Sequence, residues 1–331
     1  MDIPKFSLSP PQREALAALH ALYHRHAQSI VAVSPIVLPR PERGADLSLR
    51  ISAPRTGRDL PLLIFSHGNG GSMHSYHPLT DDWAAHGFVV IQPTFLDSNT
   101  LALPKDDPRQ QRIWLQRYED VQRVLDQLDE IEVLVPEIKG RVDHSRIAVA
   151  GHSWGAQTSS LFLGARVLKD GGSYGDMSDA RVKAGLMLAP AGLAGTHRTP
   201  FATTYLPFMN PSFETLRTPT MVVAGENDVM APLTTRGADW AADPYHLSPG
   251  GESLLTVFGA QHLLGGITSY ESTGTGDENP VAVATIQFLT TAFLKSVLDA
   301  HDDSYALALA AFAQLRHPAG TIDNKRARQI G

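Results

Sequence analysis

The 331-residue sequence contains no cysteine. Disulfide bonds, thiolate metal sites and cysteine nucleophiles are therefore excluded. Charged residues make up 19% of the chain, the net charge is −6, and no long basic run suits a nucleic-acid backbone. The basic cluster at 324–328 is expected to belong to a solvated C-terminal tail. Nucleic acid is therefore not an expected partner.

Long hydrophobic runs are also lacking. No stretch approaches the roughly 18 or more apolar residues of a membrane span. The first residues lack the charged start, apolar block and small-residue cleavage site of a secretory signal. We therefore expect a cytoplasmic protein without a membrane span. At 43% hydrophobic the composition is that of an ordinary globular protein, with enough chain for one large core.

Short apolar runs alternate with helix-like segments along the chain. A hairpin is expected first, formed by residues 29–39 and 45–54. Further buried strands are expected at 60–65, 88–95, 146–153, 184–190, 218–228 and 253–259. Helices are expected at 10–26, 79–87, 109–131, 154–168, 280–299 and 304–316.

This alternation predicts an α/β fold, with a mostly parallel central sheet and helices on both faces. We see no linker and no repeat, so the prediction is a single domain over residues 1–331. It has a helical extension at 1–29, a short irregular cap-like insertion at 191–217, and a C-terminal helix and polar tail at 300–331. The oligomeric state is left open, a homodimer included.

The sequence Gly151-His152-Ser153-Trp154-Gly155 lies where a predicted strand gives way to a predicted helix. Glycines at 151 and 155 remove Cβ atoms that would clash with the neighbouring strand and helix. Ser153 is then left in a strained turn, with its hydroxyl at the carboxyl edge of the sheet. That edge is where open α/β sheets bind their ligands. The pattern predicts a nucleophile elbow.

A serine hydroxyl needs a base to take its proton, and an acid to orient the base. Asp228 lies just past one predicted strand, and His262 follows the next by a few residues. Both are therefore expected at the same sheet edge as Ser153. Glu226 is the competing acid, and Asp228 is preferred because Glu226 is expected to lie within the strand's end. The predicted triad is Ser153, His262 and Asp228.

An ester hydrolase also needs donors for the oxyanion of the tetrahedral intermediate. One predicted donor is the main-chain N–H of Trp154. The second is expected in the glycine-rich loop after an earlier strand, where Gly68, Gly70 and Gly71 free the backbone. We place it at Asn69, with Gly70 as the alternative. Gly68 and Gly70 are also expected to lie against the substrate.

The remaining histidines offer a metal alternative. His67, His74 and His77 lie close in sequence, and the last two could share a helix face. No carboxylate stands at matching spacing, so no metal and no other cofactor is predicted. His152 is expected to pack under the elbow. Seven further histidines, His144 among them, are expected on helices or turns away from strand ends.

Four segments carry a family resemblance. They are PLLIFSHGNGGSMHSYHPLTDDWAAHGFVVIQPTF, RYEDVQRVLDQL, RIAVAGHSWGAQT and VVAGENDVMAP. Together they resemble the α/β-hydrolase superfamily, and within it the predicted dienelactone-hydrolase branch with platelet-activating-factor-acetylhydrolase-like and chlorophyllase-like enzymes. The resemblance covers about residues 46–299. It implies an α/β-hydrolase fold and the same triad and oxyanion residues. Two departures are the missing cysteine nucleophile of true dienelactone hydrolases and the elbow continuation Gly155-Ala156-Gln157.

These observations predict a serine hydrolase of carboxylic esters that acts on a small-molecule ester. The insertion 191–217 is expected to overhang the site, with Phe201, Tyr205 and Phe208 on an apolar face. These aromatic residues, with Leu263 beside the base, suggest a hydrophobic acyl or aryl group in the substrate. Packing of the aromatics onto the domain is an equal alternative. Acyl transfer or amide cleavage on the same scaffold, and a non-catalytic ligand binder, also remain open.

Overall fold

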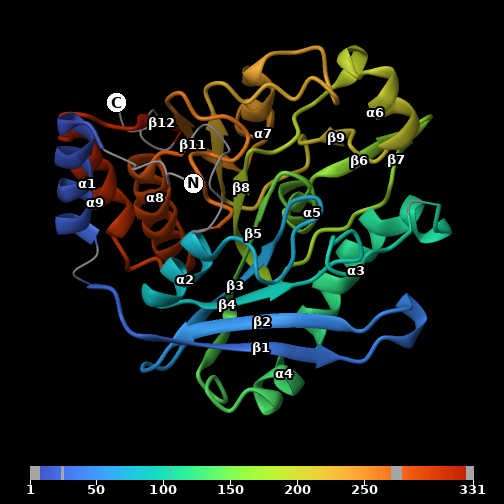
Figure 1. Cartoon of the computed structure of the whole chain (residues 1–331), viewed down its shortest axis with the longest axis horizontal. Helices are drawn as coiled ribbons and strands as arrows, with labels where there is room; N and C mark the ends of the chain where they lie inside the picture. Colours follow the sequence, from blue (N-terminus) through green and yellow to red (C-terminus); the bar gives the residue numbers. More distant parts are fainter. Residues whose placement is uncertain (1–7, 24–25, 105, 270–277, 326–331) are drawn as a thin grey trace, which may run out of the picture.

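A nine-stranded sheet with the order β1-β2-β4-β3-β5-β8-β10-β11-β12 runs through the centre of the molecule (Figure 1). The computed structural model describes residues 8–23, 26–104, 106–269 and 278–325. The strands of this sheet are β1 (Ile30–Leu38), β2 (Leu47–Pro54), β3 (Leu60–Ser66), β4 (Val89–Pro93), β5 (Val142–His152), β8 (Val182–Leu188), β10 (Thr220–Gly225), β11 (Gly251–Val257) and β12 (Gly320–Asn324).

The centre of the sheet is parallel and its edges are antiparallel. Strands β4, β3, β5, β8, β10 and β11 pair in parallel with their neighbours. The predicted hairpin β1–β2 joins β4 antiparallel at one edge, and β12 joins β11 antiparallel at the other. Because parallel strands end at the same edge, the loops after β3, β5, β8, β10 and β11 gather there.

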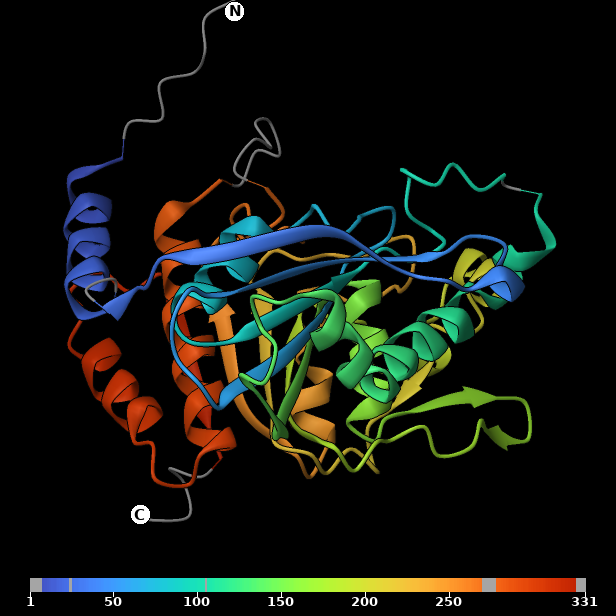
Figure 2. The same ribbon diagram turned by 90° about the horizontal axis from the view of Figure 1, so that it is seen from below.

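Helices cover both faces of the sheet. They are α1 (Pro10–Tyr23), α2 (His77–Ala85), α3 (Ile113–Asp126), α4 (Leu128–Leu134), α5 (Trp154–Phe162), α6 (Pro200–Tyr205), α7 (Asp243–Leu247), α8 (Pro280–Leu298) and α9 (Ser304–Ala313). Figure 2 shows α1, α8 and α9 on one side of the strands and α3 on the other.

Alternating side chains along each central strand supply a separate core to each face. In β3, Leu63 and Phe65 pack with α1, α2, α8 and α9, whereas Leu62 and Ile64 pack with α3, α4 and α5. A strand directs successive side chains to opposite faces, so an unbroken apolar run is what two covered faces require. The predicted α/β-hydrolase fold, with helices on both faces of a mostly parallel sheet, is confirmed.

Asn279 caps the amino end of helix α8, because its side chain accepts from the N–H groups of Val281 and Ala282. This helix is long and apolar enough to cross a membrane, contrary to the expectation that no segment approaches that limit. In the fold, 78% of its most apolar window is buried. Its apolar character is therefore that of a core helix packed between the sheet, α1 and α9.

Two predicted helices are wrong in their extent. The helix predicted at 109–131 is interrupted at Gln127, so the short 3-10 turn Pro108–Arg112, α3 and α4 replace one long helix. The helix predicted at 154–168 ends at Phe162, because Gly164 takes a φ of +105° that stops the helix. Residues Arg166–Lys169 then form β6, which pairs with β7 (Gly172–Ser173) and β9 (Pro211–Ser212).

The C-terminal segment is also more ordered than a polar tail. Strand β12 within it extends the sheet past β11. The Lys325 ammonium donates to the carbonyl of Ser248 at 3.0 Å, so this member of the 324–328 basic cluster is not simply solvated. Residues 326–328 lie outside the described residues. The insertion 191–217 joins the neighbouring strands β8 and β10, and it contains α6 and β9.

Candidate active site

Ser153 occupies the turn between β5 and α5 in a strained backbone conformation. Its φ of 57° and ψ of −121° lie in a region that non-glycine residues rarely adopt. Its N–H donates to the carbonyl of Leu188 at 2.9 Å, which ties the turn to the neighbouring strand. A Cβ atom on Gly151 would overlap the carbonyl oxygen of Gly155, and one on Gly155 would overlap that of Ser66. The predicted steric reason for both glycines is confirmed.

Three loops at the carboxyl edge bring Ser153, His262 and Asp228 into one hydrogen-bonded chain. The Nε2 atom of His262 lies 2.8 Å from the Ser153 hydroxyl. Its Nδ1 atom lies 3.0 Å from each carboxylate oxygen of Asp228. The Asp228 side chain is 1% exposed and the His262 side chain 27%. This is the arrangement in which a carboxylate orients an imidazole toward a hydroxyl.

Glu226, the competing acid, points elsewhere. Strand β10 ends at Gly225, so the expectation that Glu226 lies within the strand's end is wrong. Its side chain is exposed and accepts from the N–H of Gly259 at 2.8 Å. In the turn that follows, the buried side chain is that of Asp228, and it is Asp228, not Glu226, that binds the imidazole.

Residues 67–71 contain the predicted second oxyanion donor, and for that prediction we call them the oxyanion loop; they lie beside the elbow. The N–H of Gly68 donates to the Tyr76 hydroxyl at 3.0 Å, that of Gly70 to Asp97 Oδ2 at 3.2 Å, and that of Gly71 to the Gly68 carbonyl. Among the described residues, no hydrogen-bond partner is found for the N–H of Asn69. This leaves Asn69 as the free donor of the loop and argues against Gly70.

The other predicted donor is at the start of α5. The N–H of Trp154 opens the helix, so it has no intrahelical acceptor. Within the part of the chain that the structure describes, no other acceptor binds it. The Trp154 ring is buried and stacks on Phe208, with ring centroids 5.1 Å apart.

His152 connects the oxyanion loop to the segment that carries His262. Its Nδ1 lies 2.8 Å from the Tyr76 hydroxyl, and its Nε2 lies 2.7 Å from the main-chain carbonyl of His262. Burial, with a smaller contribution from His262, lowers the pKa of His152 to about 3. Burial raises the pKa of Tyr76 to about 12, so its hydroxyl keeps its proton. Since a carbonyl only accepts, neutral His152 donates from Nε2 and accepts the Tyr76 proton at Nδ1.

A narrow pocket opens at Ser153. Its volume is about 10 Å³, room for roughly one water molecule, so a larger group would have to displace side chains. Its apolar lining includes residues that the sequence analysis did not single out, in the loop following Asp228 and in the 3-10 turn beyond it. They are Met230, Leu233 and Trp240. The sequence could not identify these residues, because the composition of a loop does not show which of its side chains face the site.

The predicted substrate-binding aromatic residues do not line this pocket. Phe201 and Tyr205 on α6 are 50% and 69% exposed. Tyr205 and Phe208 line a separate cavity of about 700 Å³ between α6, β6 and the start of α3. Phe208 is buried and stacks on the Trp154 ring. Leu263 is half-buried beside His262 but is not among the residues that line the pocket.

The histidines considered as a metal alternative, His67, His74 and His77, do not have the arrangement that this alternative required. His74 precedes α2, so it does not share a helix face with His77. His67 is buried, with Nδ1 2.7 Å from the Gly68 carbonyl and Nε2 accepting from the Phe95 N–H at 3.1 Å. Burial and the neighbouring Arg117 lower the pKa of His67 to about 4. Both ring nitrogens are thus committed to the backbone.

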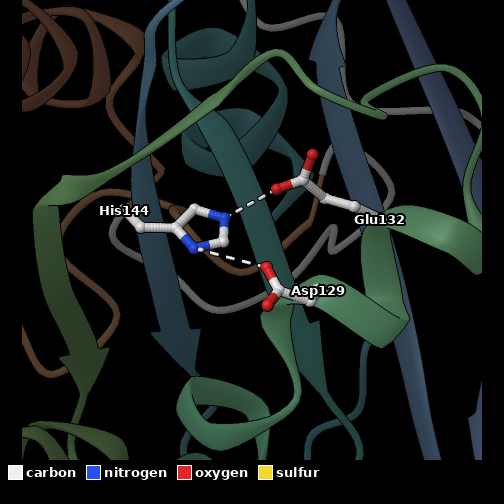
Figure 3. A group of neighbouring side chains, drawn as sticks. All are labelled: Asp129, Glu132 and His144. Atoms are coloured by element: carbon white, nitrogen blue, oxygen red, sulfur yellow. Dashed lines mark hydrogen bonds and ion pairs between the residues drawn. The ribbon is translucent and has the colours of Figure 1, made fainter.

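A different group brings three potential metal ligands together, Asp129, Glu132 and His144 (Figure 3). Their ligand atoms lie within 4.8 Å of one another. His144 Nε2 lies 2.6 Å from Glu132, and Nδ1 lies 3.8 Å from Asp129. His144 belongs to β5, so its expected place outside the strands is wrong. It lies eight residues before His152, roughly 25 Å from the elbow at about 3.3 Å per residue.

The sequence matches one family model and several proteins that are named as esterases. The family model described as Chlorophyllase matches residues 24–172. The platelet-activating factor acetylhydrolases of Cavia porcellus and Canis lupus familiaris are 29% and 28% identical over 138 and 142 residues. Each alignment covers 31% of this chain and 32% of the relative. The protein named cutinase est2 of Thermobifida alba is 26% identical over 219 residues, 65% of this chain and 57% of the relative.

The chain thus spans about a third of the acetylhydrolases and little more than half of the cutinase. The matched relatives are esterases by name. Their type agrees with the resemblance to the α/β-hydrolase superfamily, which is confirmed.

Proposed function

We propose that this chain, which has an α/β-hydrolase fold and matches relatives named as esterases, is a serine hydrolase of carboxylic esters. The observation that carries the proposal is the hydrogen-bonded chain from Asp228 through His262 to the Ser153 hydroxyl. A surface serine without such a base would be a poor nucleophile. The main-chain N–H groups of Asn69 and Trp154, for which no acceptor is found among the described residues, would meet the second requirement, which is donors for the negative charge of the oxyanion.

In the proposed reaction, the Ser153 hydroxyl attacks the acyl carbon while His262 Nε2 takes its proton. Asp228 holds the imidazole in the productive tautomer and stabilises its charged form. The oxyanion is met by the main-chain N–H groups of Trp154 and Asn69. The alcohol leaves with the proton from His262, and water then attacks the acyl-enzyme by the same path. The sequence of steps calls for no metal and no organic cofactor.

We further propose a hydrophobic acyl or aryl group in the substrate. The support is the apolar lining of the pocket at Ser153, which includes Met209, Met230 and Leu233. Its small volume favours short acyl groups, unless the lining side chains move. The exposed Phe201 and Tyr205 lie outside this pocket. The expected order of rates for activated phenyl esters is therefore acetyl and butyryl above decanoyl.

The test is turnover of these phenyl esters by the purified chain and by Ser153→Ala. Loss of the nucleophile from a triad lowers kcat by up to about 10⁶-fold, so the variant should fall to background. A fluorophosphonate should label the wild type at Ser153 and leave the variant unlabelled. Activity of the variant within tenfold of the wild type would contradict the proposed nucleophile. A rate that rises steadily with acyl length would contradict the short-acyl preference alone.

A further inference from the structure

A buried ion pair lies directly beneath the oxyanion loop. Arg117 of α3 donates from Nη1 to both carboxylate oxygens of Asp97, each at 2.8 Å. Asp97 lies in the loop that follows β4. The Arg117 side chain is 0% exposed and that of Asp97 is 5% exposed. Neither residue belongs to the Ser153–His262–Asp228 chain.

Both partners of the pair hold main-chain groups of the oxyanion loop. The Arg117 Nη2 group donates to the carbonyl of His67. Asp97 Oδ2 accepts from the N–H of Gly70 at 3.2 Å. These two groups flank Asn69 on either side. The Gly68–Asn69 peptide carries the N–H of Asn69. The ion pair therefore holds the peptide groups immediately before and after it.

The guanidinium also contacts the side chain of Trp154, the residue whose main-chain N–H is the second candidate donor. Its central carbon lies 4.9 Å from the centroid of the Trp154 ring and 4.3 Å from that of Phe95. Arg117 Nε donates to the Thr158 hydroxyl on α5 at 3.1 Å, one turn after Trp154. One side chain thus touches the oxyanion loop and the first turn of the helix after the elbow.

A purely structural role explains this arrangement poorly. Removing two charges from water costs much of what their attraction returns, so apolar residues of similar volume often stabilise a fold as well. The loop contains three glycines and adopts a φ of +75° at Gly70, so its backbone has little intrinsic preference for one conformation. The pair adds three directional hydrogen bonds, which fix two peptide groups of the loop and helix α5.

We propose that Arg117 and Asp97 are positioning residues for the oxyanion site, which set the main-chain N–H of Asn69 relative to that of Trp154. The inference rests on the proposed function. The oxyanion forms only as the hydroxyl attacks, so donors displaced by a fraction of an ångström weaken the transition state and not the bound ester. Loss of the pair should therefore lower kcat and leave KM nearly unchanged.

The test uses the full chain with Arg117→Met and Asp97→Leu combined, because removing one partner would leave an unpaired buried charge. We expect kcat for an acetyl ester to fall about 100-fold, with KM within about threefold of the wild type. Arg117→Lys retains the charge but not the fork of donors, so it should recover only part of the loss. Amide hydrogen exchange of residues 60–76 should become faster in the double variant.

The matched control removes the buried pair between Arg43, in the 3-10 turn Pro41–Arg43, and Asp120 of α3 by Arg43→Met with Asp120→Leu. Its partners are 1% and 0% exposed, and among the described residues neither makes a hydrogen bond to the oxyanion loop. Arg40, which also pairs with Asp120, keeps Glu42 and Glu119 as partners in this variant. This variant should keep kcat within about threefold and leave the exchange of residues 60–76 unchanged. The control therefore distinguishes the effect of losing any buried ion pair from the effect of losing the Arg117–Asp97 pair.

The outcomes are distinct. Unchanged kcat in the Arg117–Asp97 variant, or an equal fall in the control, overturns the inference. A fall in kcat without faster exchange in the oxyanion loop also overturns it, since the pair would then act elsewhere. If the wild type shows no Ser153-dependent turnover while the loop exchanges faster, the proposed function fails. In that case the pair holds the loop but positions no oxyanion donor, so the catalytic inference is overturned too.

Discussion

The two ends of β5 present two histidine–carboxylate pairs with different chemistry. Beyond the carboxyl end, His262 is oriented by Asp228, whose side chain is 1% exposed, and its second nitrogen faces the Ser153 hydroxyl. Near the amino end, His144 lies between Glu132 and the 94% exposed Asp129, so both its nitrogens face carboxylates. No nitrogen of His144 remains to serve a nucleophile. A histidine next to an acid is therefore weak evidence of catalysis; the free nitrogen aimed at a hydroxyl is the informative feature.

The largest expected difference between the two ends follows replacement of the acid. Asp228→Asn should lower kcat by about 10⁴-fold, because an amide favours the wrong tautomer of His262 and cannot stabilise the imidazolium. Glu132→Gln at the other end should leave kcat unchanged. Steady-state turnover of an activated acetyl ester measures both.

Glu226→Gln is the control for the first change, because Glu226 lies two residues from Asp228 and its carboxylate contacts only the Gly259 N–H in the hydrogen bonds of the described chain. It should retain activity within a few-fold of the wild type. A severe loss for Glu226→Gln together with a mild one for Asp228→Asn would reassign the acid.

The contrast also shows what the sequence can predict. Apolar runs of strand length separated by glycine-containing loops are local signals, and they predicted the central strands and the elbow. The order of these strands then placed Ser153, Asp228 and His262 at one edge by topology alone. Predicting that these three residues meet required few assumptions, because the carboxyl ends of parallel strands lie at the same edge of the sheet.

Other features depend on contacts that no local pattern records. The short strands β6, β7 and β9 and the edge strand β12 exist through their pairing partners. His144 was expected outside the strands because the polar start of β5 lacks the apolar signal of its buried half. The Arg117–Asp97 pair joins helix α3 to the loop after β4 and binds the oxyanion loop, and the sequence analysis assigned neither residue a role. Phe201 and Tyr205 were placed over the substrate from apolar character, which does not specify orientation.

A second prediction concerns the buried His152 at the carboxyl end of the same strand. Its pKa in the folded protein is about 3, against an ordinary value of 6.5. Between pH 6.5 and 3 the unfolded chain therefore binds a proton that the folded chain does not. The free energy of unfolding should fall with decreasing pH in this window, by about 1.4 kcal/mol per pH unit from this residue.

Replacement of His152 by Leu removes this contribution. Urea unfolding at several values between pH 4 and 6 should give the wild type a steeper dependence on pH than the variant, by about one proton. Other titrating groups, such as His67, are present in both proteins and cancel in the difference. Parallel pH profiles would show that His152 is protonated in the folded state or exposed to water.

The smallest expected effects are at the amino end. Glu132 accepts from His144 and from the Gly140 N–H, and its side chain is 12% exposed, so Glu132→Gln should cost about 1 kcal/mol of unfolding free energy. Asp129→Asn should cost less than about 0.5 kcal/mol, since its carboxylate is 94% exposed and its ion pair is long. Urea unfolding at pH 7 measures both, with ester turnover unchanged. A loss of turnover in either variant would mean that the two ends of β5 are coupled, and the contrast between a reactive and an inert histidine pair would no longer hold.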